Sequence, residues 1–359
     1  MSRGNNLEIT AERIRNDEYS TYRELFKQVF HKEFPVGEFQ WKYLQTPFYD
    51  EPFIYVAKNE QGEMIGARSF FPTEVVAEGK KIKALQAGDT MVRKDDRGKG
   101  LFKELTLKGM EDVKDLGYEV IFNFPNEHSY PGYLKLGWTS VASIDQYHRI
   151  LSFRGILIKK LRIRTLGKLI SAVADPVYRL LKPVSSKKKA GASICELEIL
   201  DAFSDREMDF MEKQLSKRVH QVKSRPYLQW RYTKSPRGPY EFLCYRCSDN
   251  NEVKGIAVTK TVSRGEHQVI DILEWISIDE TGEGFLGDVL TYYRERGCQT
   301  VKVWCVGDQP VFRKQLEKMG FLRRSTTLHF VVKSLVSENH QKAMAKGPWH
   351  LHKGDGDTA

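Results

Sequence analysis

Residues 89–138 read DTMVRKDDRGKGLFKELTLKGMEDVKDLGYEVIFNFPNEHSYPGYLKLGW, and the order of patterns in this stretch decides the fold of the first half of the chain. An extended segment over 85–93 leads into a charged turn with two glycines. A helical pattern follows, and its apolar positions are Leu101, Leu105, Leu107 and Met110. A strand over 119–124, an Asn-containing turn and a short helix around Tyr133 come next. Alternating strands and helices predict an α/β unit.

The turn at Arg97-Gly98-Lys99-Gly100 is a candidate anion site. Glycines let the backbone turn without a Cβ penalty, and the free N–H groups and dipole of a helix N-terminus attract a phosphate. Arg97 and Lys99 would add positive charge. The alternative, a tight strand-to-helix turn with solvated cations, is equally compatible with this motif alone.

A second pattern follows the turn, because Asn126, Ser129, Tyr133, Gly137 and Trp138 lie at offsets of 0, 3, 7, 11 and 12. Together the two patterns resemble the acetyl-CoA-binding core of the GCN5-related N-acetyltransferases (GNAT superfamily). That family carries [Q/R]-x-x-G-x-[G/A], followed later by N-x-x-A-x-x-x-Y-x-x-x-G-[F/W]. Phe102 departs from the final Gly or Ala of the first motif, and Ser129 replaces the Ala of the second.

The resemblance implies acetyl-CoA as co-substrate and assigns roles to matching positions. The turn would bind the pyrophosphate and the preceding strand the pantetheine arm; these cofactor-binding residues are Met91, Val92, Arg97, Gly98, Lys99, Gly100, Leu101 and Phe102. Tyr133 would protonate the leaving thiolate, with a half-buried helix tyrosine as the alternative. Asn126 would touch the cofactor or hold the turn, and capping the next helix explains it equally well.

An amine acceptor must be neutral to attack, so a general base is expected. Asp89 is the only carboxylate on the strand leading into the turn, which makes it the candidate base. A turn Asp that satisfies local backbone donors is the alternative. We predict no metal: Cys244 and Cys247 form a single C-x-x-C with no second close pair, so buried thiols are favoured over a zinc site.

The bulk properties describe a chain of 359 residues with 40% hydrophobic and 29% charged residues, which can form two domains. The N-terminal residues are polar, so neither a signal peptide nor a membrane span is expected. Five cysteines in a chain of this length do not make a disulfide framework. These features predict a cytoplasmic protein.

The first half begins with one or two amphipathic helices over 9–31, followed by strands near 53–58, 64–72 and 81–93. Its Gln-Trp-basic-Tyr signature at Trp41 recurs at Trp230, an offset of 189 residues. At the same offset Pro236, Phe242 and Gly255 match Pro47, Phe53 and Gly66. We interpret this register as an internal duplication.

The second copy lacks the chemistry of the first. No glycine turn precedes its helix near 283–296, where Glu280, Glu283 and Asp288 would repel a pyrophosphate. Gln309 stands in place of the Asn and Leu316 in place of the Tyr. The second half is therefore expected to complete an acceptor pocket or to serve as scaffold.

The predicted fold is α/β (α+β), with two tandem GNAT-like domains that each hold a mixed, mostly antiparallel sheet flanked by helices. We expect a catalytic domain over 1–150, a basic linker or helical insert over 151–190, a degenerate domain over 191–335 and a tail over 336–359. In the tail, Trp349 between polar residues suggests docking, whereas frayed ends are the default expectation.

Residues 149–190 hold twelve Lys or Arg and one acid, Asp175, a net charge of +11 against +10 for the whole chain. Leu166, Leu169, Ile170, Val173, Val177 and Leu180 mark one helical face, broken near Pro176. Three interpretations remain open: a connector packed on the domains, a peripheral contact with an anionic membrane on the cytoplasmic side, and polyanion binding. No recognised nucleic-acid module supports the last.

The predicted function is an acetyl-CoA-dependent N-acetyltransferase acting on a small-molecule primary amine, with an amino sugar of a surface polysaccharide pathway as the acceptor hypothesis. One alternative is a FemABX-like transferase that takes amino acids from charged tRNA, whose partner the basic linker would suit. The other is a non-catalytic CoA-binding or scaffold protein. Binding of acetyl-CoA separates all three.

Overall fold

The structure is a computed structural model that describes residues 10–49, 51–154, 157–158, 164–181, 194–265, 267–278, 282–307 and 309–357. The chain divides into two compact units that interleave in sequence. Unit 1 comprises residues 1–141, 219–237 and 328–348, and unit 2 comprises residues 142–218, 238–327 and 349–359. The domain boundaries predicted from the sequence divide the chain into consecutive repeats, which is a different division from these compact units. Those boundaries stay a prediction.

Unit 1 is built on a sheet whose strand order is β1-β2-β3-β4-β5-β13. Its strands are β1 (Thr10–Arg13), β2 (Phe53–Lys58), β3 (Met64–Ala77), β4 (Lys80–Val92), β5 (Val120–Asn123) and the end of β13 (Leu322–Ser334), with β8 (His220–Gln221) paired to β3. Its helices are α1 (Tyr19–Phe30), α2 (Leu101–Asp115), α3 (Tyr130–Lys135), α7 (Arg225–Leu228) and α10 (Glu338–Lys346).

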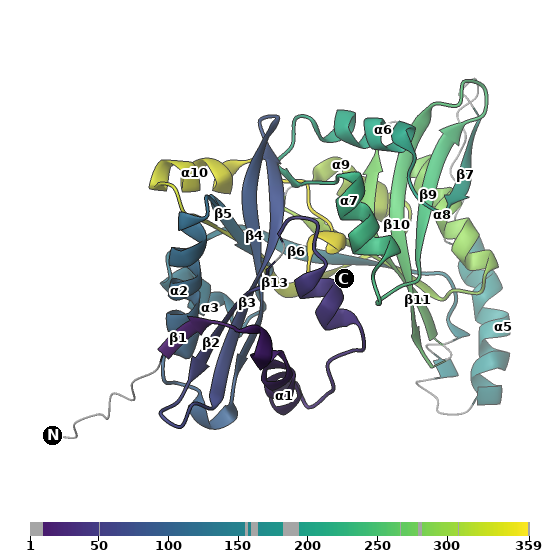
Figure 1. Cartoon of the computed structure of the whole chain (residues 1–359). Helices are drawn as coiled ribbons and strands as arrows, with labels where there is room; N and C mark the ends of the chain where they lie inside the picture. The colour runs from purple at the N-terminus through teal and green to yellow at the C-terminus, as the bar shows by residue number, and fades with distance from the viewer. Residues whose placement is uncertain are drawn as a thin grey trace. The chain divides into compact units, whose positions relative to one another are not determined.

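Apolar residues on both faces of this sheet explain its layers. On one face Tyr55, Phe70 and Leu85 join the apolar positions of α2 and α3 in a buried cluster. On the other, Ile54, Val56 and their neighbours pack with α1. Helices α1 and α2 therefore cover opposite faces of the central strands β2–β4 (Figure 1).

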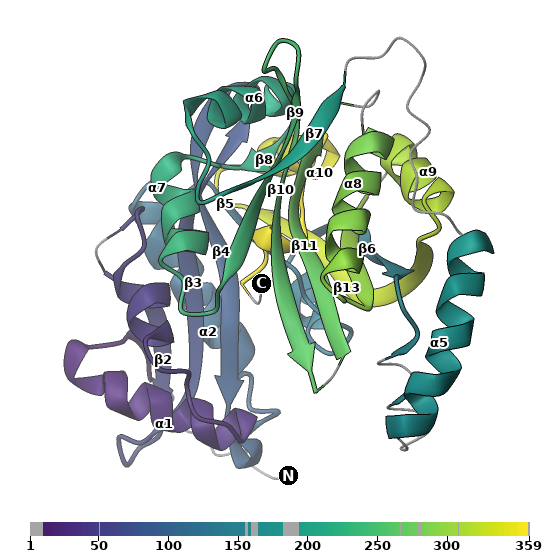
Figure 2. The same cartoon turned by 90° about the vertical axis from the view of Figure 1, so that its right-hand side faces the viewer.

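Unit 2 has the strand order β6-β12-β11-β10-β9-β7. Its strands are β6 (Thr139–Ile150), β7 (Cys195–Leu200), β9 (Tyr240–Cys247), β10 (Val253–Arg264), β11 (His267–Ser277) and β12 (Thr300–Val306). Its helices are α5 (Arg164–Leu181), α6 (Asp205–Leu215), α8 (Gly282–Glu295) and α9 (Pro310–Lys318). Helix α8 runs along β11 in Figure 2 and shares a buried apolar cluster with β11 and α9.

The order of elements in the first half recurs in the second. Strands β2, β3 and β4, helix α2, strand β5, helix α3 and strand β6 correspond in order to β9, β10, β11, α8, β12, α9 and β13. The repeated Gln-Trp-basic-Tyr segments both form short π-helical turns, η2 (Gln40–Leu44) and η4 (Gln229–Thr233), and both lie in unit 1. There the Trp41 and Trp230 rings stack at 5.0 Å, and each indole N–H donates to the other's backbone carbonyl at 2.7 and 2.8 Å.

Each unit is completed by a strand from the other half of the sequence. In unit 1, residues Val331–Ser334 of β13 pair antiparallel with β5. In unit 2, residues Ile144–Ile150 of β6 pair antiparallel with β12. Strand β6, the last strand of the first half, thus joins the sheet of unit 2, and β13, the last strand of the second half, joins the sheet of unit 1. This exchange helps to explain why the compact units are not consecutive stretches of sequence.

Two expectations from the sequence are wrong in detail. Residues Thr10–Arg13, expected to be helical, form β1 and pair with β2, because pairing with that strand overrides their local pattern. The helix of the basic segment is not broken at Pro176, which lies inside the continuous helix α5. Most of the cations of that segment lie outside the described residues.

Candidate functional site

The turn before α2 requires glycine at two positions. Gly98 and Gly100 have φ values of +80° and +84°, and a Cβ at either would meet open space. The backbone conformation, and not crowding, therefore selects glycine. Gly100 is the N-cap of α2, so the first N–H groups of a fifteen-residue helix begin directly after it. These groups and the helix dipole form a site suited to an anion.

The cations of the turn have different roles. Lys99 Nζ lies 2.7 Å from Asp96 Oδ1, and Arg93 Nε lies 2.9 Å from Asp96 Oδ2. Burial raises the pKa of Asp96, but these two hydrogen bonds bring it below its ordinary value, so the carboxylate braces the turn. Arg97 is exposed, and its Nε contacts the Val92 carbonyl at 3.4 Å. Arg97 is thus the cation better placed to meet a ligand.

Strand β4 carries a β-bulge just before this turn. Its pairing with β3 runs through Gly88 opposite Ser69 and resumes with Met91 opposite Ala67, which leaves Asp89 and Thr90 in the bulge. Asp89 has a φ of +39°, an uncommon conformation for a residue other than glycine. Neighbouring residues of a strand point to opposite faces of the sheet, and the extra residue of a bulge changes which residues beyond it face each side. Asp89 and Thr90 accordingly contact side chains on opposite faces of the sheet.

The Asp89 carboxylate lies in a buried polar cluster with Lys42 and Tyr43. Lys42 Nζ is 2.6 Å from Asp89 Oδ2, and the Tyr43 hydroxyl donates to the same oxygen. Tyr43 in turn contacts Tyr22, 2.7 Å between hydroxyl oxygens. Burial raises the pKa of Asp89, but Lys42 and the Tyr43 hydrogen bond hold it below its ordinary value. Burial and the charge of Asp89 raise the pKa of Tyr43.

On the opposite face Thr90 meets a fully buried arginine. The Arg68 guanidinium donates to Thr90 Oγ1 and, over 2.6 Å, to the Tyr133 hydroxyl oxygen. Arg68 is 1% exposed and lies over the rings of Phe70, Phe102 and Tyr133 at 5.2–5.4 Å. Within the described part of the chain no carboxylate forms an ion pair with it, and its Nε has no hydrogen-bond partner. An arginine buried without a counter-ion is costly.

The contacts of Tyr133 determine where its proton can go. Its hydroxyl oxygen accepts from Arg68 and also from Asn123 Nδ2. A phenol has two acceptor lone pairs and one donor hydrogen. Since both partners are donors, the Tyr133 proton is left for a third group. The same two donors would stabilise the phenolate formed when that proton leaves.

Asn126 has the capping role that the sequence left open. Its Oδ1 accepts from the backbone N–H groups of His128 and Ser129 at 3.1 and 3.2 Å, which orders the entry into α3. The structure therefore brings Tyr133, Thr90 and Arg68 together at the β4 bulge, next to the start of α2 through Phe102. Asn126 shows a structural role in these contacts.

Sequence reasoning missed Arg68, Asn123, Thr90 and Lys42. One signal was present, because Arg68 is the only charged residue in the apolar run from Met64 to Thr73. Lys42 was visible as the basic member of the repeated signature. The pairing of Arg68 with Tyr133, however, joins residues 65 positions apart and has no local pattern.

The corresponding place in unit 2 lacks these groups. Leu316 stands where the first copy has Tyr133, and it is fully buried in an apolar cluster. A Cβ at Gly282, the first residue of α8, would come within 2.9 Å of the Gln315 amide. The start of α8 is thus covered by a side chain. Among the described residues, no group of three or more His, Cys, Asp or Glu could hold a metal ion.

One family model and several solved structures are similar to this chain. Residues 10–141 match the family model of the acetyltransferase (GNAT) domain. A probable N-acyltransferase from Enterococcus faecalis, a conserved protein of unknown function, has a similar fold at 11% identity, with a TM-score of 0.64. That alignment covers 91% of this chain and 73% of the other. No curated protein is significantly similar in sequence.

Two further structures share the fold. A GCN5-related N-acetyltransferase from Anabaena variabilis is 10% identical, with a TM-score of 0.63 and coverage of 91% of this chain and 73% of the other. An N-myristoyltransferase from Saccharomyces cerevisiae with bound myristoyl-CoA is 11% identical, with a TM-score of 0.59 and coverage of 90% and 78%. At these identities the likeness concerns the fold.

The Lys42–Asp89 ion pair gives a pH-dependent prediction. Lys42→Met leaves Asp89 buried without its cation, so we expect a loss of about 3 kcal/mol and a melting temperature several degrees lower near pH 7. Because Lys42 lowers the folded-state pKa of Asp89 below 3.8, the pair stabilises the fold fully above that value and less as pH falls through the folded-state pKa. The gap between wild type and Lys42→Met should therefore shrink in acid.

The matched control is Lys81→Met, which removes an exposed lysine of the same sheet and should change the melting temperature little. The double variant Lys42→Met with Asp89→Asn should recover part of the loss. A Lys42→Met variant as stable as Lys81→Met at neutral pH would show that the ion pair does not hold the bulge.

Proposed function

We propose that the chain, whose residues 10–141 match the acetyltransferase (GNAT) domain, is an acyl-CoA-dependent N-acyltransferase of the GNAT superfamily that moves an acetyl group from acetyl-CoA to a primary amine. The observation that carries the proposal is the Tyr133 hydroxyl, whose two acceptor positions are filled by the donors Arg68 and Asn123. Its proton is thereby reserved for a leaving group.

The CoA phosphates would lie at the turn before α2. Gly98, Gly100 and the N–H groups at the start of the helix, with Leu101 and Phe102, would surround the pyrophosphate, and exposed Arg97 would add a charge-assisted contact. Lys99, bound to Asp96, would shape the turn and contribute charge at longer range. This arrangement supports the cofactor site that the sequence motif predicts.

The pantetheine arm would lie along an open edge of β4. Parallel pairing between β4 and β5 ends at Gln86 and Phe122, whereas β4 continues to Val92. No strand among the described residues pairs with that edge beyond Gln86, so backbone groups near Met91 and Val92 are open to an extended ligand. A peptide-like arm can bind such an edge as an added strand does.

The reaction is a direct acyl transfer. The neutral amine nitrogen attacks the thioester carbonyl carbon, a C–N bond forms, the C–S bond breaks, and the sulfur leaves as a thiolate. Tyr133 would give its proton to that sulfur, and Arg68 and Asn123 would stabilise the phenolate. The amine loses one proton to a base.

Asp89 remains our proposed base, because it is the carboxylate on the bulged strand. Its lowered pKa keeps it ionised but weakens it as a base. The contact with Lys42 also gives it a role in holding the bulge. Two measurements on Asp89→Asn separate the role of a general base from the role of an ion-pair partner. Loss of the base would change the dependence of activity on pH, whereas loss of the ion pair with Lys42 would lower the melting temperature.

The acceptor proposed here is a small-molecule amine, with an amino sugar as the working hypothesis. Its support is the predicted cytoplasmic, membrane-facing character of the chain. The N-myristoyltransferase of similar fold shows that this architecture serves long acyl chains elsewhere, so the acetyl group rests on the motif resemblance. A FemABX-like aminoacyl transferase and a non-catalytic CoA-binding scaffold are the rival proposals.

Helix α5 supports a peripheral membrane contact. Its residues Leu169, Val173, Val177 and Ile170 are 68%, 71%, 51% and 40% exposed, whereas Ser171 is buried. An exposed apolar stripe within a segment of net charge +11 fits an interfacial helix on anionic lipid. No helix in the described ranges is long and apolar enough to cross a membrane. On the basis of this exposed stripe, the location that we propose is peripheral, on the cytoplasmic face of an anionic membrane.

Acyl-CoA binding is the first test. In Arg97→Glu with Gly100→Asp, added negative charge and a strained backbone at the turn should abolish acetyl-CoA binding measured by calorimetry. Lys114→Glu, a charge reversal at the other end of α2, serves as the control and should bind as the wild type does. Failure of the wild type to bind any acyl-CoA would contradict the proposal and direct attention to charged tRNA.

Tyr133→Phe tests the proton donor. We expect kcat to fall by roughly 10²–10⁴-fold while the dissociation constant for acetyl-CoA stays within about threefold, because the ring remains and only the hydroxyl is lost. Arg68→Met should lower kcat in the same way, because the leaving group's proton donor loses one of its two hydrogen-bond partners. Full activity of Tyr133→Phe would assign the proton to another donor.

Vesicle binding tests helix α5. Wild-type protein should co-sediment with vesicles containing phosphatidylglycerol, less so at high salt, and not with neutral phosphatidylcholine vesicles. Leu169→Glu with Val173→Glu should remove this binding. Leu322→Glu, at another exposed leucine, is the control. Equal binding by the α5 variant and the control would exclude this face as the membrane contact.

A further inference from the structure

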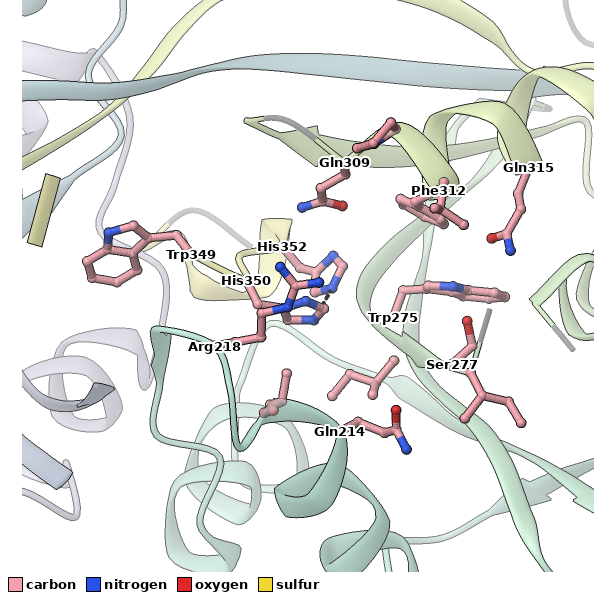
Figure 3. A pocket seen from close by; sticks show the side chains of 15 residues that line it. Gln214, Arg218, Trp275, Ser277, Gln309, Phe312, Gln315, Trp349, His350 and His352 are labelled. Atoms are coloured by element: carbon pink, nitrogen blue, oxygen red, sulfur yellow. Dashed lines mark hydrogen bonds between the residues drawn. The ribbon is translucent and has the colours of Figure 1, made fainter. Parts of the chain in front are cut away.

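Unit 2 contains a cavity that the proposed acyl transfer does not use. Parallel pairing between β11 and β12 ends at Ile272 and Val303, while β11 continues to Ser277. A cavity of about 450 Å³ is lined beyond this point by the end of β11, the start of α9, the end of α6 and residues 349–352 (Figure 3). Its volume lies within the range of small-molecule sites.

One wall of the cavity is aromatic and rigid. Trp275 stacks on Phe285 at 4.2 Å and on Phe312 at 6.2 Å, and Phe285 stacks on Tyr245 at 5.3 Å, all within 23° of parallel. Figure 3 shows Trp275 and Phe312 on one side of the cavity. Because the stack holds these rings from behind, their orientation is set before a ligand arrives.

The same wall carries an unused donor. Trp275 is 3% exposed, and its indole Nε1 is buried without a hydrogen-bond partner. A buried indole N–H usually finds an acceptor, and leaving it unpaired destabilises the fold. An oxygen on a bound ligand would satisfy it.

The facing wall comes from the C-terminal segment. His350 and His352, joined by a 2.9 Å contact between their Nε2 atoms, lie beside Arg218 and across from Trp275 in Figure 3. The segment is folded and not frayed, because Leu351 is fully buried and Lys353 forms an ion pair with Asp271 on β11. The described part of the tail after Pro348 therefore packs within unit 2 through Leu351 and Lys353.

The polar groups of the lining are mostly neutral. The amides and hydroxyl that border the cavity are Gln214, Gln309, Gln315 and Ser277. Amides and hydroxyls both donate and accept hydrogen bonds, whereas aromatic faces pack against C–H groups. That combination matches a polyhydroxylated ring, which presents C–H groups on its faces and hydroxyls at its edge.

Coenzyme A fits this cavity poorly. The Gln315 amide covers the start of α8, where a Cβ at Gly282 would come within 2.9 Å of it. The first turn of α8 also holds Glu283, which would repel a phosphate. The second copy has therefore lost the anion site of the first while keeping an opening at the corresponding strands.

We propose that this cavity binds a sugar, with the ring against Phe312 and its hydroxyls on the surrounding amides and the Trp275 indole N–H. The site is independent of acyl transfer: it lies within unit 2 and needs no acyl-CoA to be occupied. It assigns to the second copy a recognition role in place of the chemistry it lacks.

The test uses the full-length protein and a panel of free sugars: glucose, galactose, N-acetylglucosamine, glucosamine and glucuronate. Saturation-transfer NMR should detect binding of at least one, and calorimetry should give its affinity. Trp275→Phe keeps an aromatic ring but removes the indole N–H, so affinity should fall about tenfold. Trp304→Phe, the same change in β12 outside the cavity lining, should leave it unchanged.

Gln214→Met provides a second variant, because it replaces an amide on the surface of α6 by a side chain of similar size and should fold normally. It too should weaken sugar binding while acetyl-CoA binding stays as in the wild type. Absence of binding by every sugar in the panel would overturn the proposal. So would binding that Trp275→Phe and Gln214→Met leave unchanged, since the sugar would then bind elsewhere.

Discussion

The β-bulge at Asp89 and Thr90 is the constraint on which the candidate site of unit 1 depends. A regular strand places alternate side chains on alternate faces at fixed spacing, and the inserted residue resets that spacing just before the glycine turn. Asp89 is thereby held against Lys42 on the face covered by α1, and Thr90 against Arg68 on the face covered by α2 and α3.

The buried side chain of Arg68 is the most costly feature of the candidate site in unit 1. Moving a guanidinium out of water costs several kcal/mol, and among the described residues no carboxylate offsets that cost. Three aromatic faces and two hydroxyl oxygens offset part of it, with each cation–π contact contributing roughly 0.5–2 kcal/mol. A residue kept for packing alone would be better apolar. In the reaction that we propose, its contact with Tyr133 would give the charge a chemical role, because the guanidinium would stabilise the phenolate left after proton donation.

The sequence predicted the local features well, since they depend on short patterns. The glycine turn, the start of α2, the short helix with Tyr133 and the succession of strands and helices along the chain all follow from periodicity and turn residues. The exchange of β6 and β13 could not be predicted, because strand partners are chosen by tertiary packing and not by the strand's own pattern. The same reason made Arg13 and its neighbours appear helical, and it hid the pairing of Arg68 with Tyr133.

The two halves of the chain repeat one order of strands and helices but differ at the start of the corresponding helices α2 and α8. Unit 1 keeps the open glycine turn, whereas Gln315 covers the start of α8 in unit 2. The central claim is that acetyl-CoA binds at the glycine turn of unit 1 and not at the start of α8 in unit 2. Hydrogen exchange of the whole chain with and without acetyl-CoA tests this claim most directly. We predict slower exchange at residues 87–104 and 130–135 when acetyl-CoA is bound, and no change at residues 267–278 and 309–318. Protection in the second pair of segments, or none in the first, would contradict it.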